Sequence, residues 1–153
     1  MLILQSEDWD KSFVLTADID FGGSKIIPVA LGSTPGPDGF QGIAFSGIMD
    51  GDDHSLSNFV IEQGGDLCIG LFSCLDRGQI RNLGVVNFDI LGYVYVGGLV
   101  GFNSGTITSC YATGAVNGTY FVGGITGDST GTITSCHFNG VLPSDATSFY
   151  AKP

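Results

Sequence analysis

The sequence predicts an all-β fold of the parallel β-helix type, a solenoid whose coils are 24 to 27 residues long. The first observation is a repeat. Residues 95–114 are followed 26 positions later by a near copy at residues 121–140, and the run Gly105–Cys110 recurs letter for letter as Gly131–Cys136. The second is composition, since 25 glycines separate short, β-branched apolar runs without a helical period. Repeats of this length, made of short strands, indicate stacked coils.

The third observation is an apolar pattern at positions i, i+3 and i+5 that recurs in four coils. The sets are Leu56, Phe59 and Ile61; Ile80, Leu83 and Val85; Ile107, Cys110 and Ala112; and Ile133, Cys136 and Phe138. A flat strand alternates by two, so the extra residue predicts a bend between two sheets. Position i+2 holds Asn58, Asn82, Ser109 or Ser135, and small polar residues form bends through local hydrogen bonds. We expect the four sets to share one register, with Ile80, Ile107 and Ile133 in a buried column.

The N-terminal part is expected to form a cap and the first rung. Acidic residues directly after Ser6 are typical of a helix start, which predicts a short capping helix over residues 6–12 with Trp9 over the core. Residues 12–21 have a period of two and predict one strand, with Val14, Thr16, Asp18 and Asp20 on one face and the apolar residues Phe13, Leu15, Ala17, Ile19 and Phe21 on the other. Residues 22–44 contain three prolines and are expected to form a long turn and an outer loop.

The coils are expected to form one β-helix domain covering residues 1–153. Residues 13–62 make irregular first coils, residues 63–142 make regular coils, and residues 143–153 make a C-terminal tail or cap. The terminal rung of a β-helix exposes backbone N–H and C=O groups that favour aggregation unless they are covered. Either this tail or a second copy of the chain would cover them, and we favour a homodimer through the C-terminal end.

Composition excludes several classes of protein. The 153-residue chain has a net charge of −10 with only five basic residues, so it lacks the basic surface that nucleic-acid binding requires. No apolar run approaches the roughly 20 residues of a membrane-spanning helix, and we expect no membrane insertion. The opening Met1–Leu4 is too short for the core of a signal peptide, so the sequence itself gives no indication of export.

The stretch YVGGLVGFNSGTITSCYATG (residues 95–114) resembles the GLUG repeat of bacterial surface and secreted proteins. The segments FVLTADIDF, FSGIMDGDDHSLSNF and CIGLFSCLDRGQIRNLGV resemble those that usually precede such repeats, so the resemblance covers residues 6–142. It implies a right-handed β-helix and a place at the cell surface or outside the cell, on stalks or adhesin-like proteins. The repeat has no agreed catalytic residues, and none is carried over to this sequence.

The run Gly127–Gly131 (GDSTG) matches the G-x-S-x-G pattern of serine hydrolases, with Ser129 as the nucleophile. Such a site also needs a strand-to-helix turn and a histidine base, and the candidate bases are His54 and His137. In the repeat, however, Ser129 takes the place of Asn103, which predicts a turn between short strands. We therefore predict that Ser129 is not a nucleophile and that the chain has no catalytic residues.

The densest polar cluster is Asp50–His54 (DGDDH). Asp50, Asp52 and Asp53 are candidate Ca²⁺ ligands, because hard cations take several carboxylate oxygens. A glycosidase carboxylate pair is a second interpretation. An Asp-Gly turn before the strand at Leu56 explains the same residues, and the glutamate and flanking helices of an EF-hand are missing. We favour the turn, and we expect no cofactor other than this candidate Ca²⁺.

The four cysteines are expected to be free thiols. Cys110 and Cys136 fall at equivalent positions of adjacent rungs, about 4.8 Å apart, where a disulfide would be strained. Cys68 and Cys74 lie in one coil, with Cys74 aligned to Gly101. No pair has the C-x-x-C spacing of a zinc site.

The expected function is that of a non-catalytic structural or binding module, with a glycan or a protein as candidate ligand. The alternative is a carbohydrate-active enzyme, a polysaccharide lyase or glycoside hydrolase, because other right-handed β-helices cleave polysaccharides. Such lyases commonly use an arginine together with calcium and acids on one exposed face. Arg77 and Arg81 lie in one coil, but no repeated acidic patch accompanies them.

Overall fold

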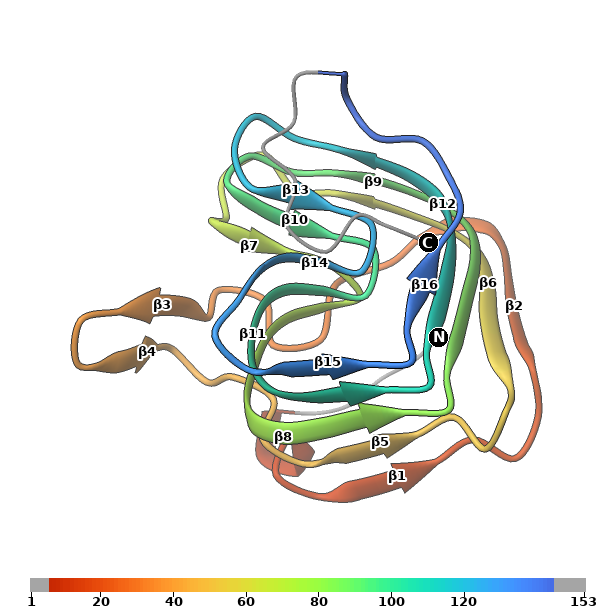
Figure 1. The fold of residues 1–153 in the computed structure, drawn as a ribbon, viewed down its shortest axis with the longest axis horizontal. Helices are drawn as coiled ribbons and strands as arrows, with labels where there is room; N and C mark the ends of the chain where they lie inside the picture. The colour runs from red at the N-terminus through yellow and green to blue at the C-terminus, as the bar shows by residue number, and fades with distance from the viewer. Residues whose placement is uncertain (1–5, 145–153) are drawn as a thin grey trace.

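A computed structural model describes residues 6–144 and confirms the predicted fold class, an all-β solenoid of parallel strands with about three turns (Figure 1). The chain winds through three parallel sheets, which we number 1 to 3, and its first coil has strands only in sheets 1 and 2. Sheet 1 lies at the bottom of Figure 1, sheet 2 on the right and sheet 3 at the upper left. Apolar side chains from all three sheets fill the interior and form one core.

The strands are short, as the glycine-separated apolar runs predict. Sheet 1 contains β1 (Ser12–Val14), β5 (Ile48–Asp50), β8 (Phe72–Arg81), β11 (Val100–Thr108), β14 (Thr126–Ser129) and β15 (Thr132–Thr134). Sheet 2 contains β2 (Ile19–Lys25), β6 (Ser55–Glu62), β9 (Gly84–Leu91), β12 (Tyr111–Asn117) and β16 (His137–Phe138). Sheet 3 contains β7 (Cys68–Ile69), β10 (Tyr95–Gly97) and β13 (Val122–Gly123). A projecting antiparallel hairpin consists of β3 (Thr34–Gly36) and β4 (Gly39–Gln41).

The predicted isoleucine column is confirmed. Ile107 pairs in register with Ile80 on one side and with Ile133 on the other, and Met49 extends the column beyond Ile80. Ile80 and Ile107 are completely buried, while Ile133 in the last coil is half-buried.

The predicted bends between sheet 1 and sheet 2 are also present. Asn82, Ser109 and Ser135 have positive φ angles of 51°, 53° and 52°, the left-handed conformation that turns the chain from one sheet into the next. The equivalent corner one coil earlier uses Asp52 and Asp53, with φ angles of 47° and 65°.

The predicted register of the Leu56 set is wrong. Leu56 pairs with Val85, and Phe59 and Ile61 pair with Phe88 and Ile90. In the following coil the apolar spacing i, i+3, i+5 occurs twice in succession, starting once at Ile80 and once at Val85. The pattern alone therefore could not tell which of these two residues Leu56 pairs with. Asn58 therefore does not share a corner with Asn82. It bends sheet 2 itself, and it accepts a 2.6 Å hydrogen bond from its counterpart, Asn87.

The alignment of Cys74 with Gly101 is wrong by one residue. Cys68 pairs with Tyr95 as expected, but Phe72 pairs with Val100 and Cys74 with Phe102, because two glycines in the later coil replace one in the earlier coil.

The close approach of β10 and β11 explains why glycines recur at this corner. A Cβ atom on Gly97 would lie 2.1 Å from the carbonyl oxygen of Val100, and one on Gly101 would lie 2.6 Å from the backbone nitrogen of Ile69. Only glycine fits where two backbones are this close.

Two predictions for the N-terminal part are wrong in detail. The capping helix expected over residues 6–12 is a single 3₁₀ turn, η1 (Ser6–Asp8), although Trp9 does pack against the core. Residues 12–21 form two strands in two different sheets, because the chain bends after Val14. Leu15 donates a backbone hydrogen bond to Asp50 at this bend, and Ala17, expected on the buried face, is exposed.

Residues 22–44 were expected to lack strands, but β2 extends to Lys25 and the hairpin β3–β4 follows. Of the C-terminal tail predicted over 143–153, residues 145–153 lie outside the described part of the chain. The cap and the homodimer through that end therefore stay predictions. Within residues 6–144, no helix is long and apolar enough to cross a membrane.

Candidate functional site

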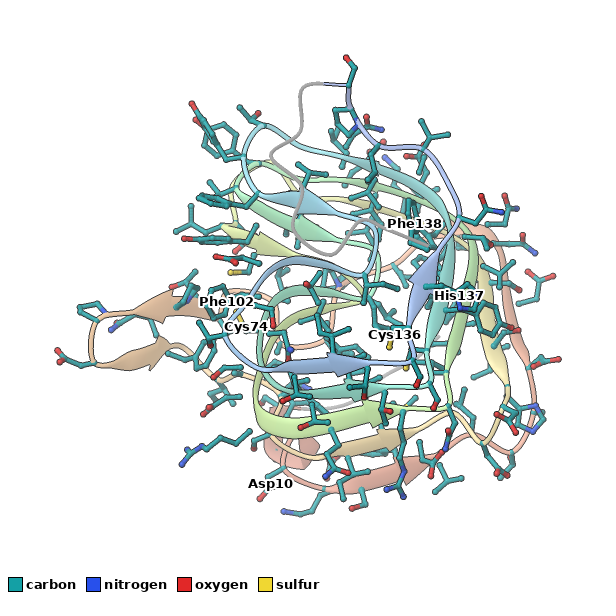
Figure 2. All side chains as sticks on the ribbon, viewed as in Figure 1. Asp10, Cys74, Phe102, Cys136, His137 and Phe138 are labelled. Carbon is teal, nitrogen blue, oxygen red and sulfur yellow. The ribbon has the colours of Figure 1, made fainter. Side chains whose placement is uncertain are left out.

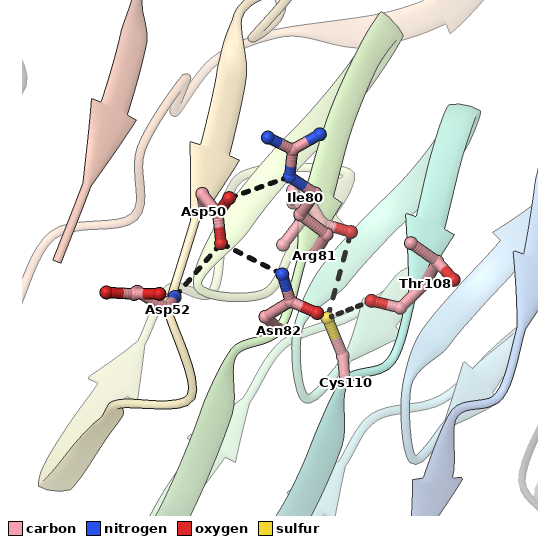
Figure 3. A network of polar contacts seen from close by, with 7 residues as sticks. All are labelled: Asp50, Asp52, Ile80, Arg81, Asn82, Thr108 and Cys110. Atoms are coloured by element: carbon pink, nitrogen blue, oxygen red, sulfur yellow. Dashed lines mark hydrogen bonds and ion pairs between the residues drawn. The ribbon is translucent and has the colours of Figure 1, made fainter.

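The acidic corner at Asp50 is held together by hydrogen bonds within the protein (Figure 3). The Asp50 carboxylate accepts hydrogen bonds from Arg81 Nε at 2.8 Å, Asn82 Nδ2 at 3.1 Å and the backbone N–H of Asp52 at 3.0 Å. The N–H of Asp52, followed by Arg81 and Asn82, lowers the pKa of Asp50 below its usual value, while burial acts weakly in the opposite direction. Both carboxylate oxygens thus join one coil to the next.

The candidate calcium ligands Asp50, Asp52 and Asp53 do not converge on a common point. Asp50 is turned toward Arg81, while Asp52 and Asp53 are exposed at the outside of the turn. Within residues 6–144, no group of three or more His, Cys, Asp or Glu side chains is arranged to hold a metal ion. The geometry matches the turn interpretation that we favour for this segment, and a Ca²⁺ site stays an alternative hypothesis.

A second polar cluster links the first two coils on the outside of sheet 2. Asp18 Oδ1 accepts a 2.8 Å hydrogen bond from the backbone N–H of Ser55, and it lies 3.3 Å from His54 Nδ1 and 3.4 Å from Ser55 Oγ. The backbone bond from Ser55 is the main reason that the pKa of Asp18 is lowered. In a catalytic triad the serine hydroxyl donates a hydrogen bond to the histidine, whereas here the Ser55 hydroxyl donates to the Asp18 carboxylate. The cluster is therefore a link between coils.

Ser129 pairs in register with Asn103, as the repeat predicts, but the predicted turn is wrong, because Ser129 is the last residue of strand β14 and Asn103 lies within β11. The Ser129 Oγ accepts hydrogen bonds from Asn103 Nδ2 at 3.0 Å and from the backbone N–H of Gly131 at 3.2 Å. The chain continues into strand β15, so the strand-to-helix turn of a nucleophile elbow is missing at this position. His137, one of the two candidate bases, belongs to sheet 2 and stacks on Tyr111 with ring centroids 5.8 Å apart.

The two arginines considered for a lyase site are both paired with acids. Arg81 binds Asp50, and Arg77 NH2 lies 3.3 Å from Asp76. Arg81 is the last residue of β8, whereas Arg77 lies in the middle of that strand, where the chain bends with a φ angle of 57°.

The feature that sequence reasoning missed is a set of aromatic rings along the outer edge of sheet 3. Tyr95 stacks on Phe121 with centroids 5.1 Å apart, and it meets Phe102 edge-on at 5.5 Å. Phe102 in turn contacts Phe40 of the projecting hairpin at 5.9 Å. Figure 2 shows Phe102 on this side of the solenoid, at the base of the hairpin.

A further pair of rings lies at the beginning of the same edge. Tyr93 and Tyr120 contact each other edge-on at 5.7 Å, and they are 48% and 51% exposed. We call these six residues the aromatic strip: Phe40, Tyr93, Tyr95, Phe102, Tyr120 and Phe121. One indication of this strip was present in the sequence, because the repeat aligns Tyr95 with Phe121. Phe40 joins the strip only because the hairpin folds against sheet 1.

The comparison with protein families points to one coil of this solenoid. Residues 92–117 match the family model described as the GLUG motif. This chain contains the GLUG motif. The motif begins just before β10, continues through β11 and ends with β12, so it passes once through sheets 3, 1 and 2. Its paired glycines make the close corner, and Ser109 within it makes the bend. The resemblance noted from the sequence is confirmed.

A relative has also been identified. Over 119 residues the chain is 35% identical to Halomucin of Haloquadratum walsbyi (strain DSM 16790 / HBSQ001). The alignment covers 71% of this chain but only 1% of the length of Halomucin. No solved structure matches the chain.

Proposed function

We propose that the chain is a non-catalytic structural and binding module of an extracellular or cell-surface protein. The GLUG motif and the similarity to Halomucin support a surface location. Because the alignment covers so little of Halomucin, the similarity also suits a module that occurs within much longer chains. The observation that carries the binding role is the aromatic strip, which presents partly exposed rings on a rigid edge.

The ligand class that best suits this strip is a neutral glycan. The flat, apolar faces of tyrosine and phenylalanine can cover the apolar face of a sugar ring, and the tyrosine hydroxyls can hydrogen-bond its hydroxyl groups. Polyanions are disfavoured, because the chain has a net charge of −10. Stacked coils hold the rings at fixed spacing, so little side-chain freedom is lost on binding.

The enzymatic alternative has no support from the site geometry. The arginines that a lyase would use are each paired with an acid, and the Ser129 hydroxyl at the end of β14 accepts hydrogen bonds from Asn103 and Gly131. The carboxylates of the acidic corner do not face one another across a groove.

The test combines a glycan array with site-directed variants. We expect the folded protein to bind one or more neutral glycans, and the Tyr93→Ala/Tyr120→Ala double variant to bind roughly tenfold more weakly, since each ring is worth about 0.5–1.5 kcal/mol. Tyr111→Ala is the matched control, because Tyr111 is a partly exposed aromatic residue on sheet 2, outside the strip. Equal losses in the two variants, or no binding to any glycan, would contradict the proposed ligand. Cleavage of a bound polysaccharide would contradict the non-catalytic role.

A further inference from the structure

Two of the four free thiols lie side by side in neighbouring coils. The register pairs Thr108 with Thr134 and Tyr111 with His137, which places Cys110 opposite Cys136. A 3.2 Å hydrogen bond from the His137 N–H to the Cys110 carbonyl fixes this alignment. Neighbouring strands are about 4.8 Å apart, so the two Cα atoms fall within the range of about 4.4–6.8 Å that a disulfide can bridge.

The surroundings of the two sulfurs differ. Cys110 is 1% exposed, and its Sγ lies 3.3 Å from the Thr108 carbonyl oxygen and 3.7 Å from that of Ile80 (Figure 3). Cys136 is half-buried on the last coil, on the inner side of the corner from which His137 points outward (Figure 2). A reagent from solution therefore reaches Cys136 first.

The hydrogen bond between the two thiols separates their acidities. The contact with Cys110 lowers the pKa of Cys136 to about 7, while the same contact together with burial raises the pKa of Cys110. A thiolate is the nucleophilic form of cysteine, so the lowered pKa favours reaction at Cys136 over Cys110.

We propose that Cys110 and Cys136 form a reversible dithiol–disulfide site that reacts with small-molecule disulfides. The Cys136 thiolate attacks one sulfur of such a disulfide, a mixed disulfide forms, and one small thiolate leaves. Cys110 then loses its proton to solvent and attacks the Cys136 sulfur, which expels the second small thiolate and closes the Cys110–Cys136 bond. The two protein thiols are oxidised, and the small disulfide is reduced to two thiols.

The spacing of the coils explains why this bond is reversible. Closing it requires the β-carbons to approach from the strand spacing of about 4.8 Å to about 3.8 Å, and strained disulfides are the more easily reduced ones. The bond would join the last described coil to its neighbour, where the short strands β15 and β16 have, among residues 6–144, a partner strand on one side only.

The second thiol pair of the chain provides an internal control. Cys68 and Cys74 are also in contact, through a thiol–thiol hydrogen bond. Both are completely buried, and the Cys74 thiol donates to the Ser33 carbonyl at 3.3 Å, beside the base of the hairpin. A soluble disulfide cannot reach either sulfur in the folded protein.

The experiment is alkylation and oxidation of the folded chain followed by peptide mapping. With iodoacetamide at pH 7 we expect Cys136 to be modified first, with a rate that rises through a midpoint near pH 7. Cys110→Ala removes the contact between the two thiols, so the pKa of Cys136 should return toward its ordinary value and the alkylation rate at pH 7 should fall roughly fivefold. Oxidised glutathione should produce an internal Cys110–Cys136 disulfide, and dithiothreitol should reverse it.

Several outcomes would overturn the proposal. They are faster alkylation of Cys68 or Cys74 than of Cys136, a mixed disulfide on Cys136 that does not resolve, and a covalent dimer as the main product. If Cys110→Ala does not fold, two measurements on the parent protein still test the proposal. They are the pH midpoint of Cys136 alkylation and the position of the disulfide found by peptide mapping. Cys136→Ala should abolish both the fast alkylation and the internal disulfide.

Discussion

The most direct test of the solenoid register is the Ile107 position. Ile107 is completely buried at the centre of a column, with Ile80 below and Ile133 above. Replacement by alanine should cost about 3–4 kcal/mol, in the upper part of the range for buried isoleucine. The cost is high because backbone hydrogen bonds fix the distance between coils, so the neighbouring side chains cannot move in to fill the cavity.

Ile133→Ala is the matched control for this prediction. The same atoms are removed, but Ile133 is half-buried and has a column partner on one side only. We expect this variant to lose about half as much free energy of unfolding as Ile107→Ala. Urea denaturation, followed by circular dichroism and by the fluorescence of Trp9, measures both values.

Ile107→Asp is the stronger form of the same test. A carboxylate at this position would be buried without a partner, and its burial should cost several kcal/mol. That cost is a large part of a total stability of about 10 kcal/mol. This variant should be unfolded at room temperature. If it melts within a few degrees of the parent, or if Ile133→Ala costs as much as Ile107→Ala, the column is wrong.

Four other predictions follow from the structure. The pKa of Asp50 is lowered in the folded state, so the stabilisation from its carboxylate should be present above about pH 3.8 and lost as the pH falls further. In Asp50→Asn the midpoint of urea unfolding should therefore fall less steeply below about pH 4 than in the parent protein. Gly97→Ala should destabilise the protein by several kcal/mol, because its Cβ would lie 2.1 Å from a carbonyl oxygen, whereas Gly64→Ala, with open space around it, should change the melting temperature little. Ser129 should form no adduct with a fluorophosphonate probe, and detection of such an adduct would contradict its non-catalytic role. Ser129→Ala should lower the free energy of unfolding by about 1 kcal/mol, because two hydrogen bonds to the hydroxyl are lost, and an unchanged stability would contradict this. Sedimentation at micromolar concentration should show a homodimer that is lost on deletion of residues 144–153, and a soluble monomer unchanged by the deletion would contradict both dimer and cap.

The sequence by itself determined the architecture and most of the core. In a solenoid each coil contacts mainly its neighbours, so spacing along the chain converts directly into position in space. This is why Ile80, Ile107 and Ile133 could be placed in one column, and why the bends at Asn82 and Ser109 could be recognised as breaks in a two-residue alternation. The pairing of Cys110 with Cys136 follows from the same spacing.

The sequence did not determine the register of the earlier coils. Leu56 could be aligned equally well with Ile80 or with Val85, because both begin an i, i+3, i+5 set, and backbone pairing selects Val85. The break between β1 and β2 was hidden for a related reason. A period of two persists through the corner, and the turn is seen only in the pairing, because β1 pairs with β5 in sheet 1 whereas β2 pairs with β6 in sheet 2.

The candidate sites depend on tertiary structure even more than the register does. The aromatic strip needs Phe40, which reaches Phe102 only through the fold of a hairpin that has no counterpart in the repeat. Likewise, the sequence marks Cys110 and Cys136 as neighbours, but the different exposure of the two thiols and the contact that lowers the pKa of Cys136 appear only in the folded chain. Repeat spacing specifies which backbones are adjacent, whereas hydrogen bonds and ring contacts between side chains depend on where each side chain is directed in three dimensions.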